Sequence, residues 1–272
     1  MTDSGAQYRL GVIGTGVMGR ALLNAAIRGG VVSASEVIAS DVSPSCRLEA
    51  EKLGCAATDD NATVVMSAES LLVAVKPQMI REVLAGIREH LHGGQLLISI
   101  AAGVPIAALQ EAAGDAARIV RVMPNVCCTV GEAASAYATG PGVSDAQRQF
   151  VADLLGAAGE AVEVEERLID AVTGLSGSGP AFAAIFIEAL TDGGVKAGLS
   201  RDQAQRLAAQ TVLGAARWVL DNDGGPARLK DLVSSPGGTT ITGVAALEGR
   251  AFRAAVIEAV TAAADRAREL GD

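Results

Sequence analysis

Residues 11–19 read Gly-Val-Ile-Gly-Thr-Gly-Val-Met-Gly, and this stretch decides the fold of the first half of the chain. The apolar run 9–13 before the turn is typical of a buried strand, and the run 17–29 after it is typical of a helix. Glycines at these spacings allow a tight turn, close approach of a pyrophosphate to the backbone, and helix–strand packing. The free N–H groups of the helix start then face the phosphates. The stretch predicts a dinucleotide-binding turn made of Gly14, Thr15, Gly16, Val17, Met18 and Gly19.

Asp41 follows the next apolar run, 37–40. An acid about 20 residues after such a turn usually accepts hydrogen bonds from the adenosine ribose and repels a 2′-phosphate. The residues after Asp41 are uncharged, and the nearest cation is Arg47. Asp41 alone therefore favours NADH over NADPH, and Ser40 beside it is a further candidate for cofactor binding.

Short apolar runs alternate with helical stretches up to about residue 125. The runs typical of buried strands are 9–13, 37–40, 71–75, 95–100 and 118–122. The helical stretches between them are 17–29, 44–53, 78–90 and 104–112. This alternation predicts parallel strands with right-handed crossovers, which is an α/β fold with an open, doubly wound sheet.

The second half of the chain is helical in character. Residues 180–198, 200–222 and 249–270 are rich in Ala, Leu, Arg and Glu, and no strand-like run follows residue 165. We therefore expect two domains, 1–165 and 166–272. Alanine-rich helices bury little area each, so a partner subunit is a natural cover for their apolar faces, although packing within the chain would also suffice.

Composition excludes several classes of protein. The net charge of −9 argues against a nucleic-acid-binding face, which is basic. No secretory signal and no uninterrupted apolar stretch of about 18 residues is present, so we expect neither a membrane span nor export. The four cysteines lack the spacing of a zinc site or a disulfide framework. We expect a cytoplasmic protein that binds no metal.

Several loops carry small or polar residues where ligands bind. Lys76 and Pro77 end the run 71–75, and the small residues of 99–104 follow the run 95–100. In the helical half, residues 173–182 read TGLSGSGPAF and residues 232–243 read LVSSPGGTTITG. The second string places glycines and hydroxyls at a helix start, which suits a carboxylate. Helix capping alone would explain the same residues.

Taken in order, the strings GVIGTGVMG, AVKPQ, AAGV, RVMPN, TGLSGSGPAF and KDLVSSPGGTTITG resemble pyrroline-5-carboxylate reductases over roughly residues 9–270. The resemblance implies a Rossmann-like, doubly wound parallel sheet followed by an all-helical dimerisation domain. It implies hydride transfer from NADP(H) or NAD(H) to the cyclic imine 1-pyrroline-5-carboxylate, giving L-proline, the last step of proline biosynthesis. It also implies a homodimer, and dimers of the family often assemble further, to a decamer.

The resemblance also assigns residues. The substrate carboxylate would bind the loop formed by Ser235, Gly237, Gly238, Thr239 and Thr240. Thr240 matches the position whose hydroxyl meets the ring nitrogen, and it is the one catalytic candidate. In the first domain, the matching cofactor positions are Asn61, Val75, Lys76, Pro77, Ala101 and Ala102.

The chain departs from the family pattern at Val126-Cys127-Cys128, where Thr-Pro-Ala is usual. Two rival hypotheses remain. A reductase of the hydroxyacid-dehydrogenase kind relies on a lysine in the helix after the domain junction, but here no lysine occurs before Lys196. A non-catalytic, cofactor-sensing regulator would have no need for the full SPGGTT string.

Overall fold

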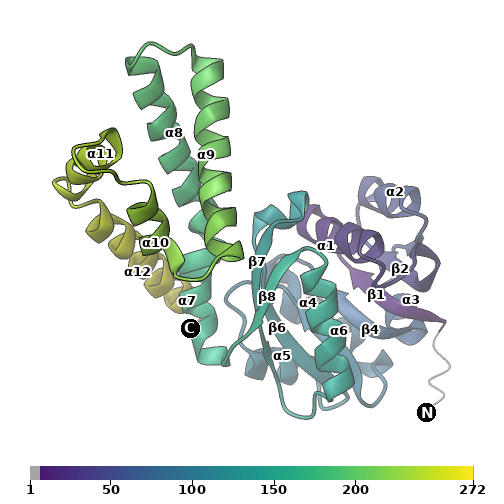
Figure 1. Ribbon diagram of the computed structural model, residues 1–272. Coiled ribbons are helices and arrows are strands. Elements are labelled where there is room, and N and C mark those ends of the chain that lie inside the picture. The colour runs from purple at the N-terminus through teal and green to yellow at the C-terminus, as the bar shows by residue number, and fades with distance from the viewer. Residues whose placement is uncertain (1–6, 272) are drawn as a thin grey trace. The chain divides into compact units, whose positions relative to one another are not determined.

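The computed structural model describes residues 7–271, which form two compact units (Figure 1). The first unit contains the chain up to Gly177 together with the segment from Ala263 onward, and the second unit is Ser178–Ala262. These units are defined by contacts within the chain. The domain boundary at 165/166 stays a prediction.

The first unit is built on one eight-stranded sheet with the order β3-β2-β1-β4-β5-β6-β7-β8. The strands are β1 (Tyr8–Ile13), β2 (Val37–Ser40), β3 (Ala56–Thr58), β4 (Ala68–Val73), β5 (Gln95–Ser99), β6 (Ala117–Met123), β7 (Ala133–Thr139) and β8 (Gly159–Glu163). The first six follow the order 3-2-1-4-5-6 of doubly wound dinucleotide-binding sheets. The chain adds β2 and β3 on one side of β1 and then crosses over to add β4, β5 and β6 on the other side. Ligands bind such sheets beyond the carboxyl ends of the strands, at the point where the order of the strands switches.

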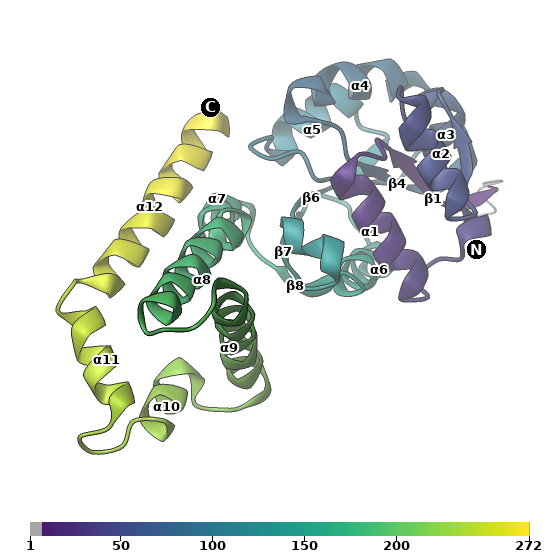
Figure 2. The ribbon, with the colours of Figure 1, turned by 90° about the horizontal axis from the view of Figure 1, so that it is seen from above.

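Helices cover both faces of this sheet (Figure 2). One face carries α1 (Val17–Arg28), α2 (Pro44–Lys52) and α6 (Asp145–Gly156). The other carries α3 (Asn61–Ser67), α4 (Ile80–Ile87) and α5 (Ile106–Ala113). The central strands are buried on both faces, and their side chains Leu10, Leu71, Leu72, Leu97 and Ile98 are at most 1% exposed. This double burial explains why the strands read as continuous apolar runs rather than alternating ones.

A continuous helical stretch leads from the sheet into the second unit. It comprises α7 (Ile169–Val172), a π-helical turn (Thr173–Gly177) and α8 (Gly179–Lys196). The helix Glu166–Lys196 has a mean hydropathy of 1.2 and is the one helix within residues 7–271 long and apolar enough to cross a membrane. Core helices of soluble proteins pass the same test of length and composition.

The second unit contains α8, α9 (Arg201–Asp221), α10 (Gly225–Leu232), α11 (Thr239–Glu248) and most of α12 (Phe252–Gly271). The helices α8 and α9 lie side by side (Figure 1). A ring–ring contact of 5.7 Å between Phe186 and Phe252 joins α8 to α12. Trp218, the single tryptophan of the sequence, lies in α9. Large apolar side chains such as Ile185 and Ile257 are about two-thirds exposed in the isolated chain, at 66% and 67%.

The five predicted strands are present, and the sheet is mostly parallel as expected. One strand pair departs from the parallel arrangement, since β7 runs antiparallel to β6. Three strands were not predicted: β3, β7 and β8. The sequence of β7, Ala133–Thr139, is mostly alanine and serine, with few of the branched or aromatic side chains that mark a strand, yet its residues 135–138 are buried.

Candidate functional site

The strand register places the predicted cofactor residues along one edge of the sheet. Ile13, the last residue of β1, pairs with Ser40 of β2 and with Val73 of β4, and Val73 pairs with Ser99 of β5. The residues that follow these strand ends therefore share the carboxyl edge. This edge is where doubly wound sheets bind their ligands.

The surroundings of the three glycines of the turn differ from one another. Gly14 has φ +93°, and a Cβ there would lie 2.8 Å from the carbonyl oxygen of Ala74. A Cβ on Gly19 would collide with the Gly14 carbonyl and lie 2.9 Å from the Ala74 methyl group. Gly16 caps the start of α1, and nothing lies within 4 Å of where its Cβ would be. Gly14 and Gly19 are needed by the packing of the protein itself, whereas Gly16 borders open space.

Asp41 is bound into this turn through both carboxylate oxygens. Oδ2 accepts the backbone N–H of Thr15 at 2.8 Å, and Oδ1 accepts the N–H of Ser43 at 2.9 Å. The Arg47 guanidinium folds back over the loop and donates to the backbone oxygen of Asp41 at 2.8 Å. Asp41 thus fixes the conformation of the turn and places a negative charge beside it.

Ser40, the residue before Asp41, forms a hydrogen bond with Asn61. The Ser40 hydroxyl donates to the Asn61 side-chain oxygen at 2.7 Å, which leaves the Asn61 amide nitrogen directed elsewhere. Asn61 is the first residue of α3, which the Asp60 carboxylate caps by accepting from Ala62 and Thr63. These hydrogen bonds hold the pKa of Asp60 below its usual value, with the Thr63 hydroxyl the largest contributor.

The remaining predicted cofactor residues follow β4 and β5. Val75 and Pro77 are half-buried, and the Lys76 side chain is exposed without a hydrogen bond or ion pair in the described part of the chain. After β5, Ala101 is buried and Ala102 is exposed. All of these residues lie at the same sheet edge as the glycine turn, as the sequence predicts.

The SPGGTT string forms the turn before α11 in the second unit. Gly237 adopts φ +68°, and the Gly238 N–H donates to the Ser235 carbonyl at 3.0 Å. A Cβ on Gly238 would collide with the Ser235 hydroxyl. Thr239 and Thr240 open the helix, where backbone N–H groups lack partners within the helix and favour an anion. The loop therefore has the chemistry of a carboxylate site.

The RVMPN string (121–125) and the TGLSGSG string (173–179), which have no assigned role in the sequence analysis, contact each other. The Asn125 amide nitrogen donates to the Ser176 carbonyl at 3.1 Å, and a Cβ on Gly177 would lie 2.5 Å from the terminal methyl of Met123. The RVMPN and TGLSGSG strings are thus packing partners at the end of β6. Sequence reasoning missed this pairing because the strings are about 50 residues apart and neither contains a charged pair that would suggest contact.

The segment Val126-Cys127-Cys128, where the sequence departs from the family pattern, lies in a 3-10 helix, Val126–Val130, beside the helix α1 that follows the glycine turn. The Asn125 side-chain oxygen accepts the Cys127 N–H at 3.1 Å, and the Cys128 sulfur lies 3.8 Å from that of Met18. Burial raises the pKa of the Cys128 thiol. Cys128 therefore packs against α1, and as a buried thiol it is a poor nucleophile.

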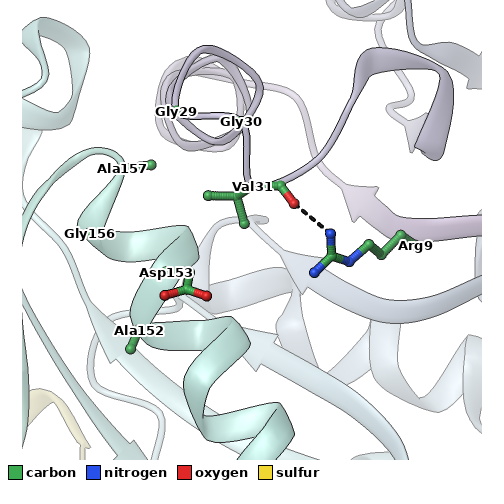
Figure 3. A pocket seen from close by; sticks show the side chains of 8 residues that line it. All are labelled: Arg9, Gly29, Gly30, Val31, Ala152, Asp153, Gly156 and Ala157. Atoms are coloured by element: carbon green, nitrogen blue, oxygen red, sulfur yellow. Dashed lines mark hydrogen bonds between the residues drawn. The ribbon is translucent and has the colours of Figure 1, made fainter.

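A separate hollow of about 510 Å³ lies at the opposite edge of the sheet (Figure 3). It is bordered by the end of α1 at Gly29 and Gly30 and by the last turns of α6, around Asp153. The Arg9 guanidinium donates to the Val31 carbonyl at 2.7 Å on its rim. Arg9 lies near the amino end of β1, so this hollow is distinct from the carboxyl edge that carries the glycine turn.

A 3-2-1-4-5-6 sheet with a glycine-rich turn at its switch point, followed by a helical unit, defines the class of two-domain, dinucleotide-dependent oxidoreductases. Comparisons with known proteins narrow this class. A family model described as pyrroline-5-carboxylate reductase dimerisation matches residues 166–270, and one described as NADP oxidoreductase, coenzyme F420-dependent, matches residues 9–103.

Curated relatives match most of the chain. A pyrroline-5-carboxylate reductase from Methanosarcina acetivorans is 47% identical over 86% of this chain and 87% of its own. One from Pisum sativum is 43% identical over 97% of this chain and 96% of its own. A solved pyrroline-5-carboxylate reductase from Coxiella burnetii, 33% identical, matches with a TM-score of 0.93 over 98% of this chain and 99% of that one.

The chain belongs to the pyrroline-5-carboxylate reductase family. The predictions of this family, of a Rossmann-like sheet followed by a helical dimerisation domain, and of an NAD(P)H-dependent oxidoreductase are confirmed. In the described part of the chain, no group of three or more His, Cys, Asp or Glu side chains is arranged to hold a metal ion.

Proposed function

We propose that the chain reduces 1-pyrroline-5-carboxylate to L-proline with hydride from NADPH or NADH. The observation that carries this proposal is the presence, in one chain of this family, of the glycine turn at the sheet edge and the SPGGTT loop at the start of α11. The first would bind a dinucleotide, and the second would bind a carboxylate. The family relatives, over nearly their full length, support the same reaction.

In this proposal the substrate carboxylate is held by Ser235, Gly238 and Thr239 at the start of α11. The Thr240 hydroxyl would hydrogen-bond the ring nitrogen. A protonated C=N bond accepts hydride readily, so the protein needs to orient the reactants more than to transfer protons. Holding both reactants at near-attack geometry contributes about 7–11 kcal/mol to lowering the barrier.

The cofactor would lie along the carboxyl edge of the first unit. Its pyrophosphate would meet Gly14–Gly19, its adenosine end would meet Ser40, Asp41 and Asn61, and its nicotinamide end would meet Ala101 and Ala102. Val75, Lys76 and Pro77 would line the path between the two ends. The open space beside Gly16 and the exposed helix start support this placement.

Asp41 bears on the choice of cofactor. Its carboxylate is held in place by Thr15 and Ser43, so it would present a fixed negative charge to a 2′-phosphate. We propose that the chain accepts both cofactors and favours NADH. A solved relative from Plasmodium falciparum has NADP bound, which supports use of the phosphorylated cofactor as well. A preference for NADPH above about tenfold, or 1.4 kcal/mol, would contradict the role given to Asp41.

We further propose a cytoplasmic homodimer formed through residues 166–272, with residues 1–165 as the dinucleotide-binding domain. Dimers would assemble further, to a decamer. The exposed apolar side chains of the helical unit support a partner subunit, and sedimentation equilibrium would measure the assembly directly. Neither a nucleic acid nor a membrane is needed in this scheme.

The reaction is tested by following the absorbance of NADPH and NADH after addition of 1-pyrroline-5-carboxylate. Thr240→Ala should lower turnover about 10- to 100-fold, the value of one hydrogen bond to a charged group, while the dissociation constant of the cofactor stays unchanged. Thr261→Ala is a matched control, because the only hydrogen bond of its exposed hydroxyl in the described part of the chain is to the Ile257 carbonyl. Wild-type turnover of Thr240→Ala would refute the role of Thr240.

The rival hypotheses give other outcomes in the same assay. Oxidation of hydroxyacids without reduction of pyrroline-5-carboxylate would indicate a reductase of the hydroxyacid-dehydrogenase kind. Cofactor binding without turnover of either substrate class would indicate a cofactor-sensing regulator.

A further inference from the structure

Arg121 carries a buried positive charge in the middle of the sheet. It lies in β6, its partner in register is Ser99 of β5, and its side chain is 8% exposed. Its guanidinium contacts Glu166 at 3.4 Å and Asp170 at 3.2 Å. Both acids come from the segment that leads out of the sheet toward the helical unit. The buried cation is therefore paired with acids that lie outside the sheet, at the base of the long helix.

The carboxylate of Glu166 has a second partner. The same oxygen, Oε1, accepts the backbone N–H of Ile106 at 2.6 Å. Ile106 is the first residue of α5, and Pro105 at the preceding position supplies no side-chain cap. A first-turn N–H has no acceptor within its own helix, and a carboxylate is favoured there by the helix dipole. Glu166 thus caps α5 from 60 residues away in the sequence.

Between β5 and α5 lies the loop 100–105, whose hydrogen bonds are found at its two ends. At its start, Ile100 donates to the Val73 carbonyl at 3.2 Å, and Ala101 donates to the Ser99 hydroxyl at 3.3 Å. At its end, Glu166 holds Ile106. Within residues 7–271, the N–H groups of 102–104 have no hydrogen-bond acceptor. In the middle of the loop, the Gly103 carbonyl oxygen lies 3.0 Å from where a Cβ on Gly271 would be, so the cap at Ile106 is one of the contacts that hold the loop in its conformation.

We infer that Glu166 is a positioning residue for cofactor binding: by capping α5 while paired with Arg121, it fixes the loop that presents Ala101 and Ala102 to the dinucleotide. This inference rests on the proposed function in one respect, the assignment of Ala101 and Ala102 to the cofactor. Glu166 itself contacts neither cofactor nor substrate in this scheme. Its effect passes through the backbone of the loop.

Three substitutions distinguish the effect of capping α5 from the effect of the ion pair with Arg121. Glu166→Ala removes the acceptor of Ile106 and one partner of Arg121. Glu166→Gln keeps an oxygen for the Ile106 N–H but removes the charge. Asp170→Asn weakens the pairing of Arg121 and leaves the cap intact. Glu165→Ala is the matched control, because this adjacent carboxylate is exposed and, among residues 7–271, pairs only with Arg167.

The readouts are the dissociation constant of NADPH, measured by nicotinamide fluorescence without substrate, and hydrogen exchange of the segment 100–109. Glu166→Ala should weaken NADPH binding about tenfold, the effect of losing one charge-assisted hydrogen bond, and should speed exchange in this segment. Glu166→Gln should restore binding to within about threefold of wild type. Asp170→Asn and Glu165→Ala should leave exchange of the segment unchanged. The kcat at saturating cofactor should change less than the KM for NADPH.

Two results would overturn the inference. One is unchanged exchange of residues 100–109 in Glu166→Ala, which would show that Glu166 does not fix the loop. The other is faster exchange with unchanged NADPH affinity, which would show that the loop does not serve the cofactor. If Glu166→Ala does not fold, Glu166→Asp gives the same decision through exchange and affinity, because its shorter side chain keeps the charge but withdraws the carboxylate from the Ile106 N–H. Failure of the proposed reaction is separate, since it would appear as a wild-type protein that binds NADPH but does not reduce pyrroline-5-carboxylate.

Discussion

Alanine at position 19 and alanine at position 16 should have opposite consequences, although both replace a glycine of the same turn. At position 19 the added methyl collides with the Gly14 carbonyl and lies 2.9 Å from the Ala74 methyl group. Both neighbours belong to rigid backbone or to a side chain without rotamers, so the turn itself must move. At position 16 the methyl enters open space, and the backbone φ of −62° suits alanine.

The magnitudes follow from these surroundings. Overpacking of this kind costs about 1–3 kcal/mol, and the better helix propensity of alanine offsets up to about 1 kcal/mol, so Gly19→Ala should lose about 1–2 kcal/mol. At about 2–4 °C per kcal/mol for a chain of this size, the melting midpoint should fall by about 2–8 °C. Gly16→Ala should change stability by less than about 0.5 kcal/mol. It should nevertheless weaken cofactor binding at least about tenfold, because its methyl occupies the approach path of the pyrophosphate.

Thermal unfolding without cofactor, followed by circular dichroism, gives the stability of each variant, and fluorescence titration with NADPH and NADH gives the affinities. Gly19→Ala should be impaired in both assays and Gly16→Ala in the second alone. A Gly16→Ala protein that binds both cofactors like wild type would refute the placement of the pyrophosphate. A Gly19→Ala protein that melts with wild type would refute the packing argument.

Three further outcomes are expected. Asp41→Asn should raise the efficiency ratio of NADPH to NADH about fivefold, because about 1 kcal/mol of repulsion from the 2′-phosphate is removed; an unchanged ratio would contradict this. The lowered pKa of Asp60 means that its contribution to stability is present above its unfolded pKa and is lost as pH falls through the folded one. The melting midpoints of wild type and Asp60→Ala should therefore converge below about pH 4, and a constant difference down to pH 2 would argue against it. Finally, burial raises the thiol pKa of Cys55 and Cys128, so a thiol reagent at pH 7.5 should leave both unmodified in the native protein, as peptide mass mapping would show.

The fold was predictable where burial on both faces left a continuous apolar run, as in the strand 95–99, and where glycine spacing has a single physical explanation, as in 14–19. β7 was missed because most of its residues are alanine or serine, and local sequence does not show that residues 135–138 are buried. The antiparallel pairing of β7 follows from the short connection after β6, which contains no crossover helix long enough for a parallel return.

The candidate site likewise contains residues that could be predicted from the sequence and residues that could not. Residues that act through their own position in a motif, such as Gly14 and Asp41, were found from spacing. Glu166 and Asn125 were not found, because their roles depend on partners about 50–60 residues away. A carboxylate that caps a distant helix looks, in sequence, like any other surface acid.

The placement of Trp218 gives the two units separate optical labels. It is the only tryptophan in the chain and lies in α9, whereas both tyrosines, Tyr8 and Tyr137, lie in strands of the first unit. Emission excited at a wavelength selective for tryptophan therefore reports on the helical unit alone, and circular dichroism reports on both. The difference between the two unfolding curves measures how far the cofactor-binding sheet and the helical unit melt as one cooperative body.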